Sequence, residues 1–270
     1  MKLLQCFVLA VLLTSSILSH ANLLVTPKRV VFSDRDRTQQ VVLVNAGNKP
    51  RSYRIEWKEY QQLPTGGYKI LSEEEAQGRN KASDYMRFSP RQVRLEPGER
   101  QVVKIMARRK AGMPRGEYRS HLLFTALPPE EEVEAPEEGI SMKLHVLVSY
   151  SIPVMMNIGY ETPNFSITNI EVAQTPEEGD KFADLNVGLD KLGDFSAYGR
   201  INAFFKPEGV DNFSQVAVLN GVNVFGEANE YNAKLTWLEA PQSISGILKL
   251  QFEGQAENAG VIFAEKQIQL

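Results

Sequence analysis

Residues 140–152 read ISMKLHVLVSYSI, with an apolar side chain at every second position. The apolar series is Ile140, Met142, Leu144, Val146, Val148, Tyr150 and Ile152. Because successive side chains of a strand point to opposite faces, this pattern predicts a β-strand with one continuous apolar stripe. Its 13 residues make it long for a strand. Two interpretations follow: a half-buried strand of a β-sandwich, or a strand whose stripe is offered, at least in part, to another protein.

Residues 1–21 have the pattern of a secretory signal. Lys2 precedes a short Leu/Val/Ile run, and Ser19-His20-Ala21 places small residues where a signal peptidase reads. The run is short for a membrane span. Cleavage near Ala21 would leave about 249 of the 270 residues, and the single cysteine, Cys6, would be removed with the signal. We therefore expect an exported, periplasmic protein that is held together by burial and contains no disulfide.

Charge and hydropathy exclude some classes of partner. The formal net charge of −3 becomes −4 once Lys2 is removed, so bulk charge gives no basis for nucleic-acid binding. No apolar run after the signal approaches the length of a membrane span, so no membrane insertion is expected.

The remaining sequence predicts an all-β protein. Short alternating or apolar runs, separated by turn residues, predict roughly seven strands in residues 22–156, which is typical of an immunoglobulin-like sandwich. Two polar segments interrupt them. Residues 61–84 are expected to form a surface excursion with a solvated glutamate run at 73–75, and residues 128–139, with six glutamates and three prolines, a mobile loop.

The second half of the chain shows the same pattern of short alternating runs separated by turn residues. Gly159 and Pro163 mark a boundary in residues 157–164, so we expect a second β-sandwich domain over residues 157–270. Its seven predicted strands are 165–172, 182–189, 198–205, 213–219, 231–237, 247–252 and 261–270.

Catalytic and metal-binding patterns are sparse. His121 and His145 both lie on predicted strands, and no set of ligands has zinc-site spacing. No serine lies in a nucleophile elbow, and no glycine-rich loop of a nucleotide site is present. We therefore expect no enzyme activity, no cofactor and no metal.

Three local patterns resemble the PapD-like periplasmic chaperones of pilus and fimbria assembly. Residues 29–32 (RVVF) are similar to the family's first-strand arginine with its apolar pair and phenylalanine. Residues 89–105 (SPRQVRLEPGERQVVKI) resemble its Pro-Gly turn and basic strand. Residues 127–129 (LPP), a long loop and the alternating strand resemble its sixth-to-seventh strand hairpin. The resemblance covers residues 23–155, and beyond them only the all-β texture.

The resemblance implies two immunoglobulin-like domains set as a boomerang and a function without turnover. Such chaperones donate their seventh strand to a pilus subunit that lacks its own last strand, and they pass the subunit to an outer-membrane usher. Residues 140–152 would be the donor strand, with Ile140, Met142, Leu144, Val146 and Val148 contacting the subunit. Whether the free protein covers its stripe by self-association is left open.

The family also anchors the subunit's terminal carboxylate with two cations in the cleft between the domains. Arg29 matches the first-strand arginine, but residues 148–150 (VSY) lack the lysine that the family carries late in its seventh strand. If Leu127 lies near Ile140 in an antiparallel pair, Arg119 falls beside Val148 and is a candidate second cation. The alternative is that Arg119 is solvated or pairs with an acid such as Glu117.

An alternative function is a structural pilus subunit or adhesin of the same assembly. Subunits carry a free alternating N-terminal extension and lack the last strand, whereas a strand here is predicted directly after the signal and the last strand is present. A secreted β-sandwich hydrolase is the third class, and no catalytic constellation supports it.

Overall fold

The structure, a computed structural model, describes residues 23–128, 147–172, 184–238 and 245–270. Within these ranges the regular structure consists of strands β1 to β18 and two 3-10 helices of three residues each, η1 (Ala82–Asp84) and η2 (Ala256–Asn258). Neither helix is long enough to cross a bilayer. The predicted all-β class is therefore confirmed.

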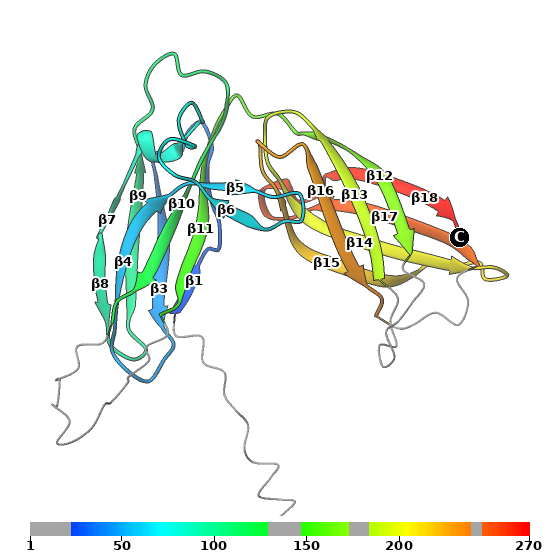
Figure 1. The fold of residues 1–270 in the computed structure, drawn as a ribbon, viewed down its shortest axis with the longest axis horizontal. Helices are drawn as coiled ribbons and strands as arrows, with labels where there is room; N and C mark the ends of the chain where they lie inside the picture. The colour runs from blue at the N-terminus through cyan, green and yellow to red at the C-terminus, as the bar shows by residue number, and fades with distance from the viewer. Residues whose placement is uncertain (1–22, 129–146, 173–183, 239–244) are drawn as a thin grey trace, which may run out of the picture.

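Strands β1 to β4 and β7 to β11 form the two facing sheets of a first unit (Figure 1). One sheet has the order β1 (Leu23–Thr26), β3 (Thr38–Asn45), β9 (Arg100–Ala107) and β7 (Met86–Ser89). The other has the order β2 (Val30–Phe32), β11 (Ser149–Ile158), β10 (Gly116–Ala126), β4 (Arg51–Lys58) and β8 (Gln92–Leu95). Alternate side chains from both sheets fill the core, among them Phe32, Leu43, Tyr53, Ile105, Leu122, Phe124 and Val154. This is the predicted immunoglobulin-like sandwich.

The chain changes sheets between β1 and β2. β1 pairs with β3 in one sheet, whereas β2 pairs in parallel with β11 in the other. The parallel pairing joins Val30, Val31 and Phe32 to residues 154–156 of β11. Arg29, the last residue before β2, is thereby placed at the edge of the five-stranded sheet.

Strand β11 starts later than the sequence pattern predicts. Leu147 and Val148 are described, belong to no strand and are 40% and 48% exposed. Residues 140–146, with Ile140, Met142, Leu144 and Val146, lie outside the described residues. At the other end of the stripe, Ile152 is buried in the first core and Tyr150 packs against it. The sandwich-strand interpretation therefore holds for this end of the stripe.

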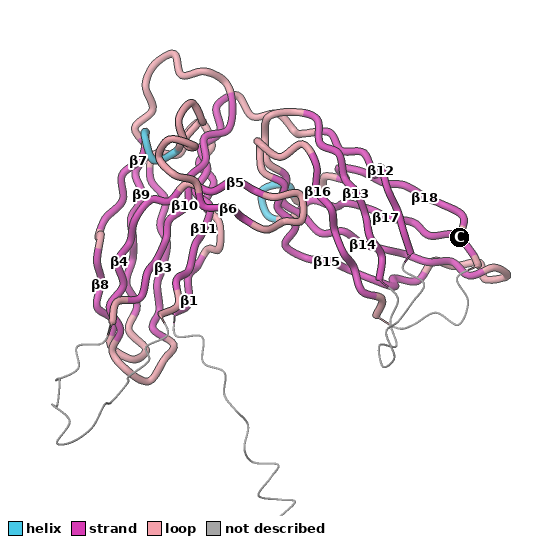
Figure 2. The backbone as a smooth tube through the Cα atoms, viewed as in Figure 1, coloured by secondary structure: helices cyan, strands magenta, loops and turns pink. Residues whose placement is uncertain are grey.

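The prediction for residues 61–84 was wrong in part. They hold most of an antiparallel hairpin, β5 (Tyr60–Gln62) and β6 (Tyr68–Ile70), as well as η1. Gln62, Leu71 and Ala76 are buried, although the glutamates at 73–75 are exposed as expected. Figures 1 and 2 show the hairpin reaching from the first unit toward the strands of the second.

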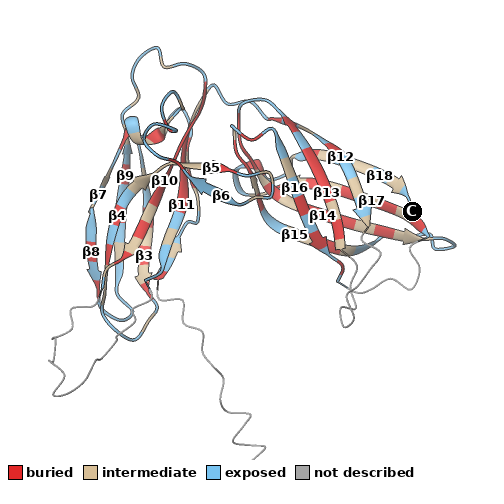
Figure 3. Cartoon of the chain, in the orientation of Figure 1, coloured by how far each residue is buried: buried red, intermediate tan, exposed pale blue. Residues whose placement is uncertain are grey.

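Strands β12 to β18 form the second unit and confirm all seven predicted strands. One sheet has the order β12 (Asn164–Val172), β13 (Asp184–Leu192) and β16 (Glu230–Thr236). The other has the order β15 (Ser214–Val224), β14 (Ala197–Pro207), β17 (Gly246–Gly254) and β18 (Ile262–Gln269). Buried residues alternate along these strands and meet in a separate core (Figure 3). Asn157 and Ile158 still pair with β10, so these two residues extend the first unit's sheet.

Candidate functional site

The outer face of β10 carries the polar residues that meet the second unit. Tyr118, Leu122 and Phe124 point into the first core, so the alternation of the strand turns Glu117, Arg119 and His121 to the opposite face. All three are less than 10% exposed. An outer face that is buried must be covered, and the β5–β6 hairpin and the second unit cover it.

Arg29 lies at this junction. One of its terminal nitrogens donates to Asn223 Oδ1, and the other is 2.6 Å from Glu257 Oε1 and 3.7 Å from Met155 Sδ. Its guanidinium also lies 4.6 Å from the centroid of the Tyr198 ring. Burial lowers the pKa of Arg29 below its usual range, and the carboxylates of Glu257 and Glu117 offset part of this effect. The guanidinium stays protonated because its ordinary pKa is so high.

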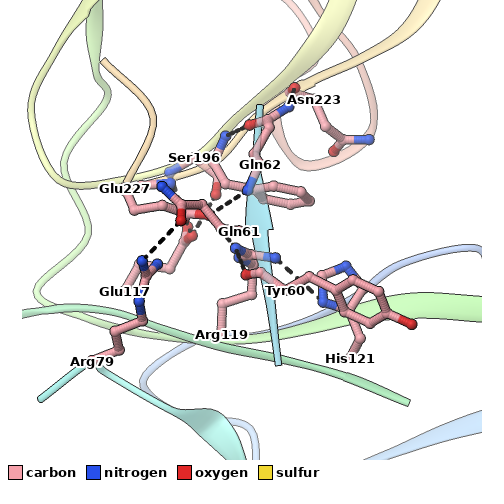
Figure 4. Close-up of polar contacts among 12 residues, drawn as sticks. Tyr60, Gln61, Gln62, Arg79, Glu117, Arg119, His121, Ser196, Asn223 and Glu227 are labelled. Atoms are coloured by element: carbon pink, nitrogen blue, oxygen red, sulfur yellow. Dashed lines mark hydrogen bonds and ion pairs between the residues drawn. The ribbon is translucent and has the colours of Figure 1, made fainter. Parts of the chain in front are cut away.

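Arg119 is held in a neighbouring set of contacts (Figure 4). It forms an ion pair with Glu227 of the second unit, donates to the carbonyl of Tyr60 at 2.9 Å, and lies 3.2 Å from His121 Nδ1. Its guanidinium stacks over the Phe225 ring at 4.1 Å. The sequence-based alternative is thus right that Arg119 pairs with an acid, but the acid is Glu227.

The register predicted for Arg119 was wrong. In the antiparallel ladder of β10 and β11, Arg119 lies opposite Met155, and the described pairing ends at Thr125 and Ser149. Val148 lies seven residues from Met155, or roughly 23 Å at the usual rise of a strand. Arg119 is nevertheless at the junction, because Met155 also contacts Arg29. The structure therefore brings Arg29 and Arg119 to the same face, on either side of β11.

Glu117 and Gln62 connect the two units directly. The Glu117 carboxylate accepts the backbone N–H of Ser196 at 2.9 Å and that of Gly226 at 3.3 Å. Burial raises the pKa of Glu117, and these hydrogen bonds offset part of the shift. The Gln62 side chain donates to the carbonyl of Asn223 at 2.6 Å and accepts the N–H of Phe225 at 2.8 Å.

The backbone at this joint is tightly packed. A Cβ atom on Gly226 would lie 2.4 Å from the carbonyl oxygen of Asp194, so only glycine fits there. A cavity of about 280 Å³ remains between the units, with Tyr60, Glu117, Arg119 and Glu227 among the residues that line it.

Sequence reasoning singled out the two arginines but missed most of the polar residues that surround them at the junction. Gln62, Ser196, Asn223, Glu227 and Glu257 are single polar residues outside any motif, and they come from segments far apart in the chain. The only available signal was the arrangement of Glu117, Arg119 and His121 at every second position of a strand, which predicts a polar outer face.

The pH dependence of stability offers a test of the buried His121. Burial and the positive charge of Arg119 lower the pKa of His121 from 6.5 to about 3. A pKa lowered by folding means that the unfolded chain takes up the proton first, so this contribution to stability is complete above pH 6.5 and is lost toward pH 3. We expect the free energy of unfolding to fall by about 1–2 kcal/mol from this residue between pH 7 and pH 5.

The measurement is urea unfolding at both pH values for the wild type and for His121→Gln. The variant keeps an acceptor for Arg119 but cannot titrate, so its loss of stability between the two pH values should be smaller by that amount. An identical loss in both proteins would show that His121 is not buried in its neutral form.

Comparison with known proteins gives a likeness of fold. No family model matches the chain, and no curated protein matches its sequence. Among solved structures, the chain is similar to the CupB2 chaperone of Pseudomonas aeruginosa, with a TM-score of 0.47 and 13% identity over 92% of this chain and 100% of that one. It is also similar to the SafB chaperone of Salmonella enterica, solved in complex with the SafA pilin, with a TM-score of 0.45 and 12% identity over 92% and 96% of the two chains.

A third similar structure is the class 5 fimbriae chaperone CfaA, with a TM-score of 0.47 and 12% identity over 92% of this chain and 100% of that one. All three of these solved chains are named as chaperones, one of them as a fimbriae chaperone and one in complex with a pilin. Likenesses of this strength do not assign a function, so the function has to be inferred from the residues of this chain.

Proposed function

We propose that this protein is a periplasmic chaperone that holds a pilus or fimbrial subunit by donating a β-strand and delivers it to an outer-membrane usher. The division into a signal (1–21), a chaperone domain (22–156) and a second sandwich (157–270), with the domains set as a boomerang, is part of this proposal. Capture of a subunit in this way requires no turnover and no cofactor.

One observation carries the proposal: a free strand edge ends beside Arg29. β11 has β10 on one side along its whole length, whereas β2 covers its other side only at residues 154–156. Among the described strands, none pairs with the outer edge of residues 149–153. An unpaired edge of this kind accepts another strand through main-chain hydrogen bonds.

The position of Arg29 fixes the direction of the added strand. Arg29 directly precedes β2, so a strand added along residues 149–153 in line with β2 would end near its guanidinium. If the added strand meets Arg29 with its C-terminal carboxylate, it must run parallel to β11. A guanidinium can clasp a carboxylate with two parallel hydrogen bonds. Arg119, on the same face across β11, is proposed as the second cation.

Residues 140–148 would extend this donor strand. If Ile140, Met142, Leu144 and Val146 each bury in a subunit, every side chain contributes roughly 1.5–3 kcal/mol. The loss of translational and rotational freedom on association offsets several kcal/mol of the sum. The remainder is enough to hold a subunit firmly while it travels to the usher.

The test is purification of the tagged protein from the periplasm. We expect a subunit of the appendage to co-purify with it, and we expect no complex from a strain in which the subunit gene is deleted. A subunit shortened by its last residues should not be captured. Equal recovery of the full-length and the shortened subunit would contradict capture through the terminal carboxylate.

A further inference from the structure

Arg29 already binds a carboxylate that belongs to its own chain. Glu257 Oε1 lies 2.6 Å from a terminal nitrogen of Arg29, which is within the range of a charge-assisted hydrogen bond. Glu257 comes from η2 in the second unit, whereas Arg29 precedes β2 in the first. The contact therefore bridges the two units at the point where the proposed client carboxylate would arrive.

The turn that carries Glu257 is fixed by its neighbours. The Asn258 side chain donates to the Tyr160 hydroxyl at 2.8 Å and accepts the backbone N–H of Tyr198 at 3.1 Å. Ala256 has a φ of +52°, a left-handed conformation that alanine rarely adopts, so the surrounding contacts must hold it there. The turn thus presents the Glu257 carboxylate to Arg29 on a defined support.

The pair is nevertheless open to exchange. The Glu257 side chain is 34% exposed, and Arg29 is the only partner found for its carboxylate in the described part of the chain. The pair of Arg119 and Glu227 differs, because Glu227 also accepts the backbone N–H of Gln62 at 3.3 Å and Arg119 also binds the carbonyl of Tyr60. Arg29 and Glu257 can separate without breaking any other hydrogen bond of the Glu257 carboxylate, whereas Arg119 and Glu227 are part of a network.

We propose that Glu257 is an internal stand-in for the client's terminal carboxylate, which occupies Arg29 in the free chaperone and is displaced when a client binds. This inference rests on the proposed function. The exchange replaces one ion pair by another of the same chemistry, so Arg29 is never left unpaired in the cleft. It also removes one contact between the two units, while the contacts made by Glu117, Gln62 and Arg119 remain.

The experiment measures binding of a minimal carboxylate to the intact mature chain. The probe is N-acetylglycine, with N-acetylglycinamide as the uncharged control, and the readout is the NMR signal of the Arg29 Nε–H group. Four proteins are compared: the wild type, Glu257→Gln, Glu253→Gln as the matched control, and Arg29→Ala to assign the signal. The control also loses an ion pair, that of Glu253 with Arg200 at 2.9 Å, but both of these residues belong to the second unit. The competing pair is partly solvated, with side chains 12% and 34% exposed, so its removal should have a modest effect. We expect Glu257→Gln to bind the probe about two- to fivefold more tightly than the wild type. Glu253→Gln should bind it no more tightly than the wild type.

Each outcome separates the stand-in from the proposed function. Equal affinity of the wild type and Glu257→Gln would overturn the stand-in but leave Arg29 as a carboxylate site. Equal tightening by both glutamine variants would also overturn it, since any loss of negative charge would then suffice. Absence of binding at Arg29 in every protein would overturn both the stand-in and the carboxylate anchor of the proposed function.

Discussion

Arg29→Ala is expected to abolish pilus assembly while the protein remains folded and exported. The arginine is 12% exposed and meets the second unit through Asn223, Glu257 and Tyr198, but it belongs to neither apolar core. Its removal should therefore leave both sandwiches intact. Loss of one partner of a desolvated charge pair costs about 2–5 kcal/mol in binding, which is enough to release a client.

The measurement combines electron microscopy of surface pili with pull-down of the subunit and thermal melting of the chaperone. Arg200→Ala is the matched control. This substitution also removes an ion pair, that of Arg200 with Glu253 at 2.9 Å, but both residues lie within the second unit. Arg29→Lys keeps the positive charge but cannot form two parallel hydrogen bonds with a carboxylate. Its piliation and subunit recovery should lie between those of the wild type and the alanine variant. Normal piliation in Arg29→Ala would count against the carboxylate anchor.

Leu144→Glu or Val146→Glu is expected to eliminate subunit capture with little change in the chaperone's melting temperature. Both residues lie outside the described part of the structure, and the expectation rests on the alternation of residues 140–152 before a free strand edge. A carboxylate placed in an apolar subunit groove loses the leucine or valine contacts and leaves a charge without a partner. The expected loss of binding is about 3 kcal/mol or more.

Two further variants serve as controls, one expected to keep binding and one expected to unfold the protein. Lys143→Glu changes the charge by a larger amount, at a position that the sequence alternation assigns to the opposite face, and should still capture the subunit. Ile152→Glu lies in the first core, where the wild-type side chain is 4% exposed, and should unfold the chaperone. If Leu144→Glu instead melts tens of degrees lower and its remaining folded fraction still binds, the stripe belongs to the core.

The sandwich strands could be predicted because their burial is periodic. In β17, for example, every second residue from Gly246 to Gly254 is buried, and the sequence alternates accordingly. The β5–β6 hairpin gave no such signal. Its strands have three residues each, and all three residues of β6 are exposed. What orders the hairpin is its contact with residues 223–232 of the second unit, which no local pattern can reveal.

The register error has a simple physical cause. The prediction placed Arg119 beside Val148 by assuming that strands start and end where the apolar patterns do. Directly opposite residues of an antiparallel pair share a face. The core residues of β10 and β11 have even numbers, such as Leu122 and Ile152. Arg119 therefore had to face an odd-numbered residue, and the sequence alone was sufficient to exclude Val148.

The joint also has a consequence for how the protein matures. Arg29 is oriented by Asn223, 194 residues later in the chain, and by Glu257 still further on. If the protein is exported with its N-terminus first, as the proposed signal implies, the proposed donor strand at residues 140–152 emerges before either orienting residue. At that stage the proposed chaperone would expose the unpaired edge of this strand before Arg29 has been positioned. Under the proposed function, competence to select the C-terminal end of a subunit is thus expected only after translocation has passed residue 257.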